Sequence, residues 1–131
     1  MRKLRVLFSA IALLEAAASA PSAAAELDGV WLSQDGATKV GVAPCRQNAK
    51  FHCATVLSDR PEQGEPSDAG KVVGYNFASN GDGWEGLIAP GGREPMAATL
   101  RLQHTDRLEM KVCPVALWCD VQIYQRLRRS N

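Results

Sequence analysis

The stretch that decides the fold is MAATLRLQHTDRLEMKV, residues 96–112. Apolar side chains stand at every second position in each of its halves. They are Met96, Ala98, Leu100 and Leu102, then Leu108, Met110 and Val112. This alternation is typical of β-strands that turn one face toward a core. Because the polar segment 104–106 separates the halves, the stretch predicts an antiparallel hairpin.

The same kind of pattern extends outward to six more segments. We expect strands at 29–32, around 40–42, and at 54–58, 72–79, 84–89 and 121–127. Glycine-containing turns separate several of them, and no window of residues 26–131 has a helical period. Successive antiparallel strands favour an all-β fold, a small up-and-down β-barrel of about eight strands, because closure removes exposed edges. A β-sandwich is the alternative.

The amino-terminal segment has the layout of a secretory signal peptide. Basic Arg2, Lys3 and Arg5 precede an apolar run over 6–14, and small residues continue to Ala25. We expect residues 1–25 to be a signal peptide and 26–131 to be a single β-barrel domain, although cleavage before Pro21 is an alternative. The apolar run is shorter than the ~20 residues that span a bilayer, so a periplasmic or secreted protein without a membrane span is predicted.

The charge of the chain argues against nucleic acid as a partner. The 131 residues carry a formal charge of +1, and loss of three basic residues and Glu15 with the signal peptide leaves −1. A nearly neutral domain lacks the basic surface that nucleic-acid binding requires.

Four cysteines predict two disulfides in an exported protein. Three connectivities are possible, and we expect the local one, Cys45 with Cys53 and Cys113 with Cys119. The alternation of side chains between the two faces of a strand raises one difficulty for the second pair, because the two cysteines are expected on opposite faces. It places Cys119 on the face of Val121, which we expect to point inward, and Cys113 on the opposite face. A bulge near Pro114 is therefore expected.

Catalytic and metal-binding patterns are missing from the sequence. His52 and His104 are the only histidines, and no serine and acid stand at recognisable spacing from them. The cysteine spacing fits neither zinc nor a redox motif. The acidic segment 58–70 lacks the spacing of a calcium loop and is expected to be solvated. We therefore predict no enzyme, no cofactor and no metal, and we expect Trp84 and Trp118 in the core.

Two resemblances refine the fold. Gly29-Val30-Trp31 on the first strand, with Arg126 on the last, resembles the lipocalin arrangement in which an arginine covers a tryptophan ring. GWEGLIAPGG, residues 83–92, and Tyr124-Gln125-Arg126 resemble the bacterial domain-of-unknown-function family 2147. That resemblance implies an exported, lipocalin-like calycin barrel, closed by Gly29, Trp31 and Arg126, with no assigned activity. Cys113 and Cys119 stand where that family has glycines.

These features lead to a prediction about function. Eight strands enclose either packed side chains or one small ligand. We expect a small apolar or amphipathic ligand in a pocket near the open end, lined by Trp84, Met96 and Met110. The alternative is a periplasmic inhibitor or protein-interaction module with a filled barrel. The expected inward-facing residues are Val40, Val42, Met96, Ala98, Leu100, Leu102, Leu108, Met110, Val112, Val121 and Ile123.

Overall fold

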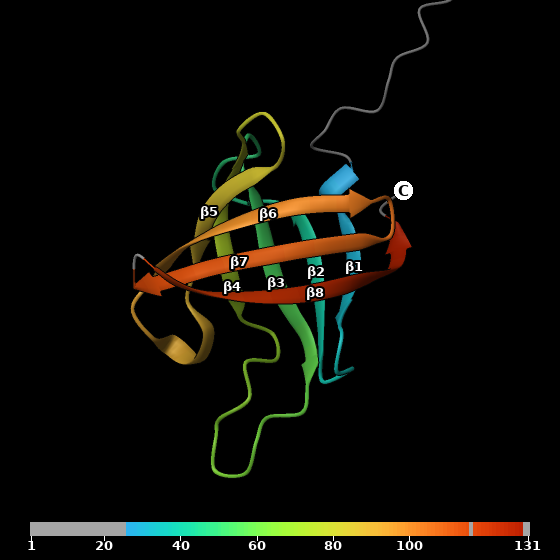
Figure 1. The fold of residues 1–131 in the computed structure, drawn as a ribbon. Helices are drawn as coiled ribbons and strands as arrows, with labels where there is room; N and C mark the ends of the chain where they lie inside the picture. Colours follow the sequence, from blue (N-terminus) through green and yellow to red (C-terminus); the bar gives the residue numbers. More distant parts are fainter. Residues whose placement is uncertain (1–25, 116, 130–131) are drawn as a thin grey trace, which may run out of the picture.

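A computed structural model describes residues 26–115 and 117–129 of the chain. These residues form the predicted all-β barrel, in which eight antiparallel strands follow one another in sequence order and close into a ring (Figure 1). The strands are β1 (Gly29–Ser33), β2 (Thr38–Pro44), β3 (His52–Asp59), β4 (Val72–Ser79), β5 (Trp84–Ile88), β6 (Met96–His104), β7 (Arg107–Val115) and β8 (Trp118–Arg129). The predicted up-and-down barrel is confirmed.

Closure depends on the pairing of the first strand with the last. In the β1–β8 ladder Trp31 lies opposite Arg126, with a register irregularity between Val30 and Trp31. The opening stretch forms the expected β6–β7 hairpin, in which Leu100 lies opposite Met110. A two-residue turn, Thr105 and Asp106, joins these strands. Each strand thus finds both of its hydrogen-bonding partners within the barrel.

The two ends of the barrel differ in their connections. The start of β1 and the β2–β3, β4–β5 and β6–β7 connections lie at one end, which we call the closed end. The other end, the open end, carries the β1–β2, β3–β4, β5–β6 and β7–β8 connections. Two of these are long, and the β5–β6 loop contains the short 3-10 helix η1 (Pro90–Gly92). The β3–β4 loop projects well beyond the strands in Figure 1.

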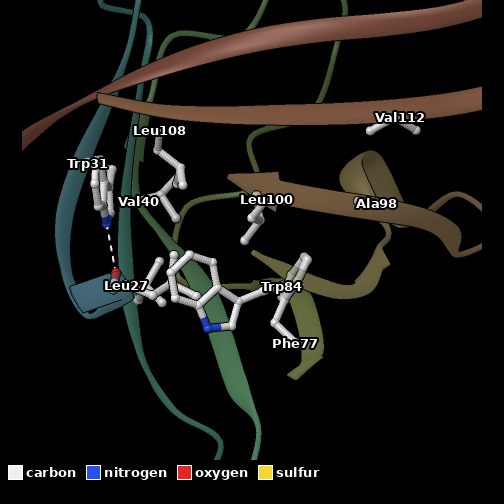
Figure 2. Packing of buried hydrophobic residues seen from close by; sticks show 10 residues of the cluster. Leu27, Trp31, Val40, Phe77, Trp84, Ala98, Leu100, Leu108 and Val112 are labelled. Carbon is white, nitrogen blue, oxygen red and sulfur yellow. Dashed lines mark hydrogen bonds between the residues drawn. The ribbon is translucent and has the colours of Figure 1, made fainter. Parts of the chain in front are cut away.

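The core is concentrated toward the closed end. Leu27 and Trp31 are its most deeply buried large side chains, and Trp31 is only 1% exposed. In Figure 2 they gather with Trp84, Leu100 and other apolar residues, whereas Val112 lies apart from them. The apolar packing is therefore dense at one end of the barrel and thins toward the other.

The sequence prediction for β8 was wrong in one respect. Val121 is 53% exposed, and Ile123, which we also expected inside, shares its outer face. Asp120 and Gln122 instead lie opposite Val112 and Met110 and line the interior. The register of the β7–β8 ladder sets this face, and polar side chains are tolerated inside because this part of the barrel is open to solvent.

Both expected disulfides are present, Cys45–Cys53 near the closed end and Cys113–Cys119 at the open end. Cys113 and Cys119 are both exposed on the outer face, so the difficulty of opposite faces disappears once Val121 points outward. A register irregularity does occur between Val112 and Val115.

The prediction of a core position for Trp118 was wrong. This indole begins β8 beside the exposed disulfide and is 78% exposed. The tip of a hairpin that extends beyond the barrel has no opposing wall to cover it. Trp31 and Trp84, which lie within the barrel, are buried.

The predicted signal peptide, residues 1–25, lies outside the described residues. Within the described ranges, 26–115 and 117–129, no helix has the length and apolar character needed to cross a membrane.

Candidate functional site

The interior of the barrel is hollow toward its open end. A cavity of about 500 Å³ lies there, which is within the ~300–1,000 Å³ range of small-molecule sites. Its walls come from strands all around the barrel and are mainly apolar. They include Val40, Val42, Val56, Phe77, Ile88, Met96, Leu100, Leu108, Met110 and Val112. The barrel is therefore not completely filled by its own side chains.

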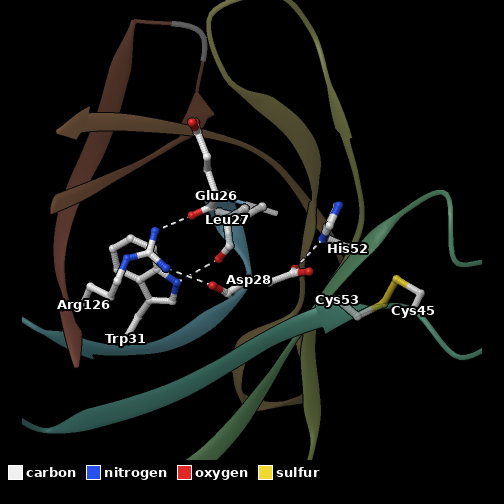
Figure 3. A network of polar contacts seen from close by, with 8 residues as sticks. All are labelled: Glu26, Leu27, Asp28, Trp31, Cys45, His52, Cys53 and Arg126. Carbon is white, nitrogen blue, oxygen red and sulfur yellow. Dashed lines mark hydrogen bonds and ion pairs between the residues drawn. A yellow bond between two sulfur atoms is a disulfide. The ribbon is translucent and has the colours of Figure 1, made fainter. Parts of the chain in front are cut away.

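Trp31 forms the inner limit of this cavity at the closed end. Its indole Nε1 donates a hydrogen bond of 3.0 Å to the Leu27 carbonyl, which satisfies the only polar atom of a buried ring. The Arg126 guanidinium lies over the ring, 4.2 Å from its centre. Figure 3 shows this stack beside the first residues of the described chain. The expected closure by Trp31 and Arg126 is present.

Arg126 also ties three separate segments together. Its Nη1 donates to the Asp28 carbonyl at 2.8 Å, and its Nη2 donates to the carbonyl of Glu26. Its Nε donates to the Thr105 carbonyl at 2.8 Å. A planar guanidinium suits this role because its donors point in several fixed directions. The residue holds the entry to β1 and the β6–β7 turn against the end of β8.

A second polar pair lies next to this network. His52 is buried, and its Nδ1 is 2.7 Å from Oδ1 of Asp28. The adjacent Cys53 forms the disulfide with Cys45 (Figure 3). His52 therefore supports the closed end, because it links the start of β3 to the segment that precedes β1.

The mouth of the cavity has a different character, because the β3–β4 loop brings carboxylates to it. Asp59, Glu65 and Asp68 line this edge, and Asp120 joins them from β8. The hydroxyl of Ser67 and the backbone N–H of Asp68 donate to Asp59. These bonds favour the ionised form and hold the pKa of Asp59 below its ordinary value of 3.8. The carboxylate of Asp59 thus anchors the loop.

One side of the cavity wall is polar as well. Gln122 and Tyr124 project inward from β8, and the Tyr124 hydroxyl donates to Oε1 of Gln122 at 3.0 Å. Burial raises the pKa of Tyr124 above 10.0, and the negative charge of Asp35 adds to the effect. The neutral phenol therefore persists to higher pH than in an exposed tyrosine.

The structure brings together two of the three residues predicted to line a pocket. Met96 and Met110 both line the cavity. Trp84 does not, and lines a separate, smaller hollow of about 240 Å³. The reason is the register: Trp84 lies opposite Leu100 at the closed-end start of β5, whereas Met96 lies opposite Ile88 near the open end. The indole Nε1 of Trp84 has no hydrogen-bond partner in the described part of the chain.

Sequence reasoning missed the polar half of this site. Asp59, Glu65 and Asp68 were expected in a solvated loop. The predicted inward direction of Val121 and Ile123 left no place inside for Asp120 and Gln122. A signal for the second pair was available in the cysteines. Cys113 shares the outer face of Lys111, because side chains alternate along a strand. A disulfide to Cys119 then places Cys119 and Val121 on that outer face and Gln122 on the inner one. No comparable local pattern indicates that the loop carboxylates reach the barrel mouth.

The arrangement is suited to holding a molecule with both apolar and polar parts. Apolar walls exclude water from one portion of a guest, while the mouth offers hydrogen-bond acceptors. Among residues 26–115 and 117–129, no group of three or more histidine, cysteine, aspartate or glutamate side chains is placed to hold a metal ion.

Comparisons with protein-family models, with curated proteins and with solved structures find no match to this chain. The resemblance of residues 83–92 to family 2147 therefore stays a prediction.

Proposed function

We propose that this chain is an exported, lipocalin-like binding protein whose barrel holds one small apolar or amphipathic molecule. The observation that carries the proposal is the cavity of about 500 Å³, whose apolar walls end at a polar mouth. The two disulfides support export to the periplasm or the cell exterior, because such bonds persist in oxidising compartments. The resemblance to family 2147 points the same way.

The cavity predicts binding of a neutral apolar probe. N-phenyl-1-naphthylamine is suitable, because its fluorescence rises on transfer from water to an apolar site. Titration should give a saturable increase with one site per chain. Energy transfer from Trp31, which lines the cavity, should report the same site. A response that stays absent or non-saturable at high micromolar concentration would contradict the proposal.

Filling the cavity provides the matched control. Ala54 lines the cavity, so Ala54→Leu should remove much of the space and weaken probe binding. Ala97 is exposed on the outer face of β6, so Ala97→Leu adds the same atoms where no cavity exists. Circular dichroism of both variants should show the barrel intact. Equal probe affinity in the two variants would place the bound probe elsewhere.

An interaction module is the second candidate, and a different observation favours it. The β7–β8 tip exposes Val115, Leu117 and Trp118, and Leu117 is 92% exposed. Contiguous exposed apolar residues are typical of protein contact sites. Cross-linking in the native compartment should then capture a partner with the natural protein and lose it in Leu117→Ser/Trp118→Ser. If the double substitution leaves the captured partner unchanged, the β7–β8 tip is not the contact site and the interaction-module function is not supported.

A further inference from the structure

The lining of the cavity contains more acidic than basic residues, although Lys71, outside the lining, also acts on Asp59. Four carboxylates line the cavity, those of Asp59, Glu65, Asp68 and Asp120. Arg93 is the only basic residue among the lining residues that the structure describes. Glu65 and Asp120 are exposed, so water screens part of the field of these carboxylates, but the excess of negative charge in the lining remains. The mouth therefore favours a positive charge and disfavours a negative one.

The carboxylate of Asp68 holds the β3–β4 loop in place at the mouth. Its Oδ2 accepts a hydrogen bond of 2.9 Å from the backbone N–H of Gly91, which ties the β3–β4 loop to η1. Its Oδ1 is buried and has no hydrogen-bond partner within the described ranges. A buried carboxylate oxygen without a donor is unfavourable. Asp68 itself lines the cavity, but this oxygen is covered by protein, so a donor on a guest reaches it only if the β3–β4 loop shifts.

We infer that the ligand of this cavity is a cationic amphiphile, an apolar chain or ring that carries a protonated amine. This inference rests on the proposed binding function and names the chemical class of its ligand. The ammonium group lies at the mouth among the carboxylates of Asp59, Glu65, Asp68 and Asp120. The apolar part extends inward past Met96 and Met110 toward Trp31. A fatty acid of the same length meets the same apolar walls but places its carboxylate against like charges.

A matched pair of ligands tests the inference. Decylammonium and decanoate each contain ten carbon atoms and carry opposite charge at neutral pH, and each is measured by displacement of bound N-phenyl-1-naphthylamine. Decylammonium should bind about tenfold more tightly, an estimate that sums several solvent-screened pairs. The preference should decrease as salt is added. Equal affinities, or tighter binding of decanoate, would overturn the inference and leave the proposed function standing. Failure of the neutral probe to bind would contradict both.

Substitutions at the mouth locate the effect. Asp68→Asn and Asp120→Asn should each reduce the preference for decylammonium several-fold, and Arg93→Gln should increase it. Affinity for the neutral probe is measured for each variant, and the preference is expressed relative to it, so that any change in the cavity itself is separated from the effect of charge. Glu62→Gln removes a charge from the same loop at an exposed position that does not line the cavity. If Glu62→Gln reduces the preference as much as Asp68→Asn, general surface charge is responsible and the assigned site is wrong.

Discussion

Arg126 and Trp31 illustrate how much one pair of residues contributes to closing this barrel. The side chain of Arg126 is almost fully buried, yet it carries a permanent charge. Three backbone carbonyls and the face of an indole surround that charge and replace water. A buried charge is tolerated only with such partners. The Asp106 carboxylate also lies 3.9 Å from the Nε of Arg126, so the charge of Arg126 is surrounded by both backbone and side-chain partners.

Trp31→Ala should destabilise the protein more than Arg126→Lys. Loss of a buried tryptophan costs about 3–5 kcal/mol through lost burial and the cavity that remains. Lysine keeps the charge but lacks the fork of donors, so we expect a cost of about 1–3 kcal/mol from unsatisfied carbonyls and the weaker stack. Urea unfolding measures both. If the two variants show equal, small shifts of the urea midpoint, Trp31 and Arg126 do not stabilise the closure of the barrel as described.

Gly83 occupies a position where no larger side chain fits. A Cβ atom at this residue would lie 2.1 Å from the backbone oxygen of Leu100. Gly83→Ala should therefore force the β5 and β6 backbones apart and cost at least ~1–3 kcal/mol. Gly41→Ala is the control, because its Cβ would meet only the flexible side chain of Leu57 at 3.4 Å. Thermal unfolding that shows the same loss for both variants would refute this steric reason.

The pKa of Tyr124 predicts an effect at alkaline pH. Its folded-state pKa is raised above 10.0, so the folded protein holds the phenolic proton more tightly than the unfolded chain. The associated stability is complete below the unfolded value and is lost as pH rises through the folded value. In Tyr75→Phe, phenolate absorbance reports Tyr124 alone and should have a midpoint above 10.0. Asp35→Asn should lower this midpoint only in part, because burial is the larger cause.

At the scale of elements, the two disulfides brace hairpin connections at opposite ends of the barrel. Cys45–Cys53 closes the β2–β3 connection beside buried His52, and Cys45 is itself buried. Cys113–Cys119 closes the exposed β7–β8 tip. In the loop-entropy account each short loop contributes roughly 2–3 kcal/mol by restricting the unfolded chain. The bonds are similar in this respect but differ in their access to solvent.

Reduction should therefore proceed in a defined order. A mild thiol reductant is expected to open Cys113–Cys119 first, because attack requires access to a sulfur atom. Alkylation of the released thiols, followed by peptide mapping, identifies which pair has opened. The barrel should remain folded at this stage, since the core lies toward the other end. Earlier labelling of Cys45 and Cys53 would show that exposure does not control the order.

At the scale of the whole molecule, the features that stabilise the barrel and the proposed binding site lie at opposite ends. The closed end contains the densest apolar packing, the Arg126 network and the His52–Asp28 pair. The open end contains the cavity, the long β3–β4 loop and most of the inward polar groups. A hollow interior costs packing energy, which a bound guest restores.

Ligand binding should accordingly stabilise the folded protein. A guest that binds only the folded state adds about 2.7 kcal/mol at a concentration one hundred times its Kd. N-phenyl-1-naphthylamine should raise the midpoint of thermal unfolding of the natural protein. Ala54→Leu should show a smaller rise at the same probe concentration, while Ala97→Leu should match the natural protein. A rise that is equal in all three would indicate binding outside the cavity.

The sequence by itself determined the local features of this protein. The alternation over residues 96–112 predicted the β6–β7 hairpin, because side-chain direction in a strand repeats every two residues. The short spacing within each pair of cysteines predicted the two local disulfides, because residues close in sequence at a hairpin are also close in space. Gly29, Trp31 and Arg126 indicated the closure through a resemblance. All of these signals involve neighbouring residues or a known motif.

Only the tertiary structure decided which residues share the interior. Asp59 reaches the mouth from the end of β3, Asp68 from the loop that follows, and Asp120 from a strand far along the chain. The outward direction of Val121 depends on pairing with β7, and the exclusion of Trp84 depends on the register of β5 with β6. Whether the barrel is hollow depends on side-chain volumes summed across all the strands. Each of these properties belongs to the closed ring, so no single segment of the sequence contains it.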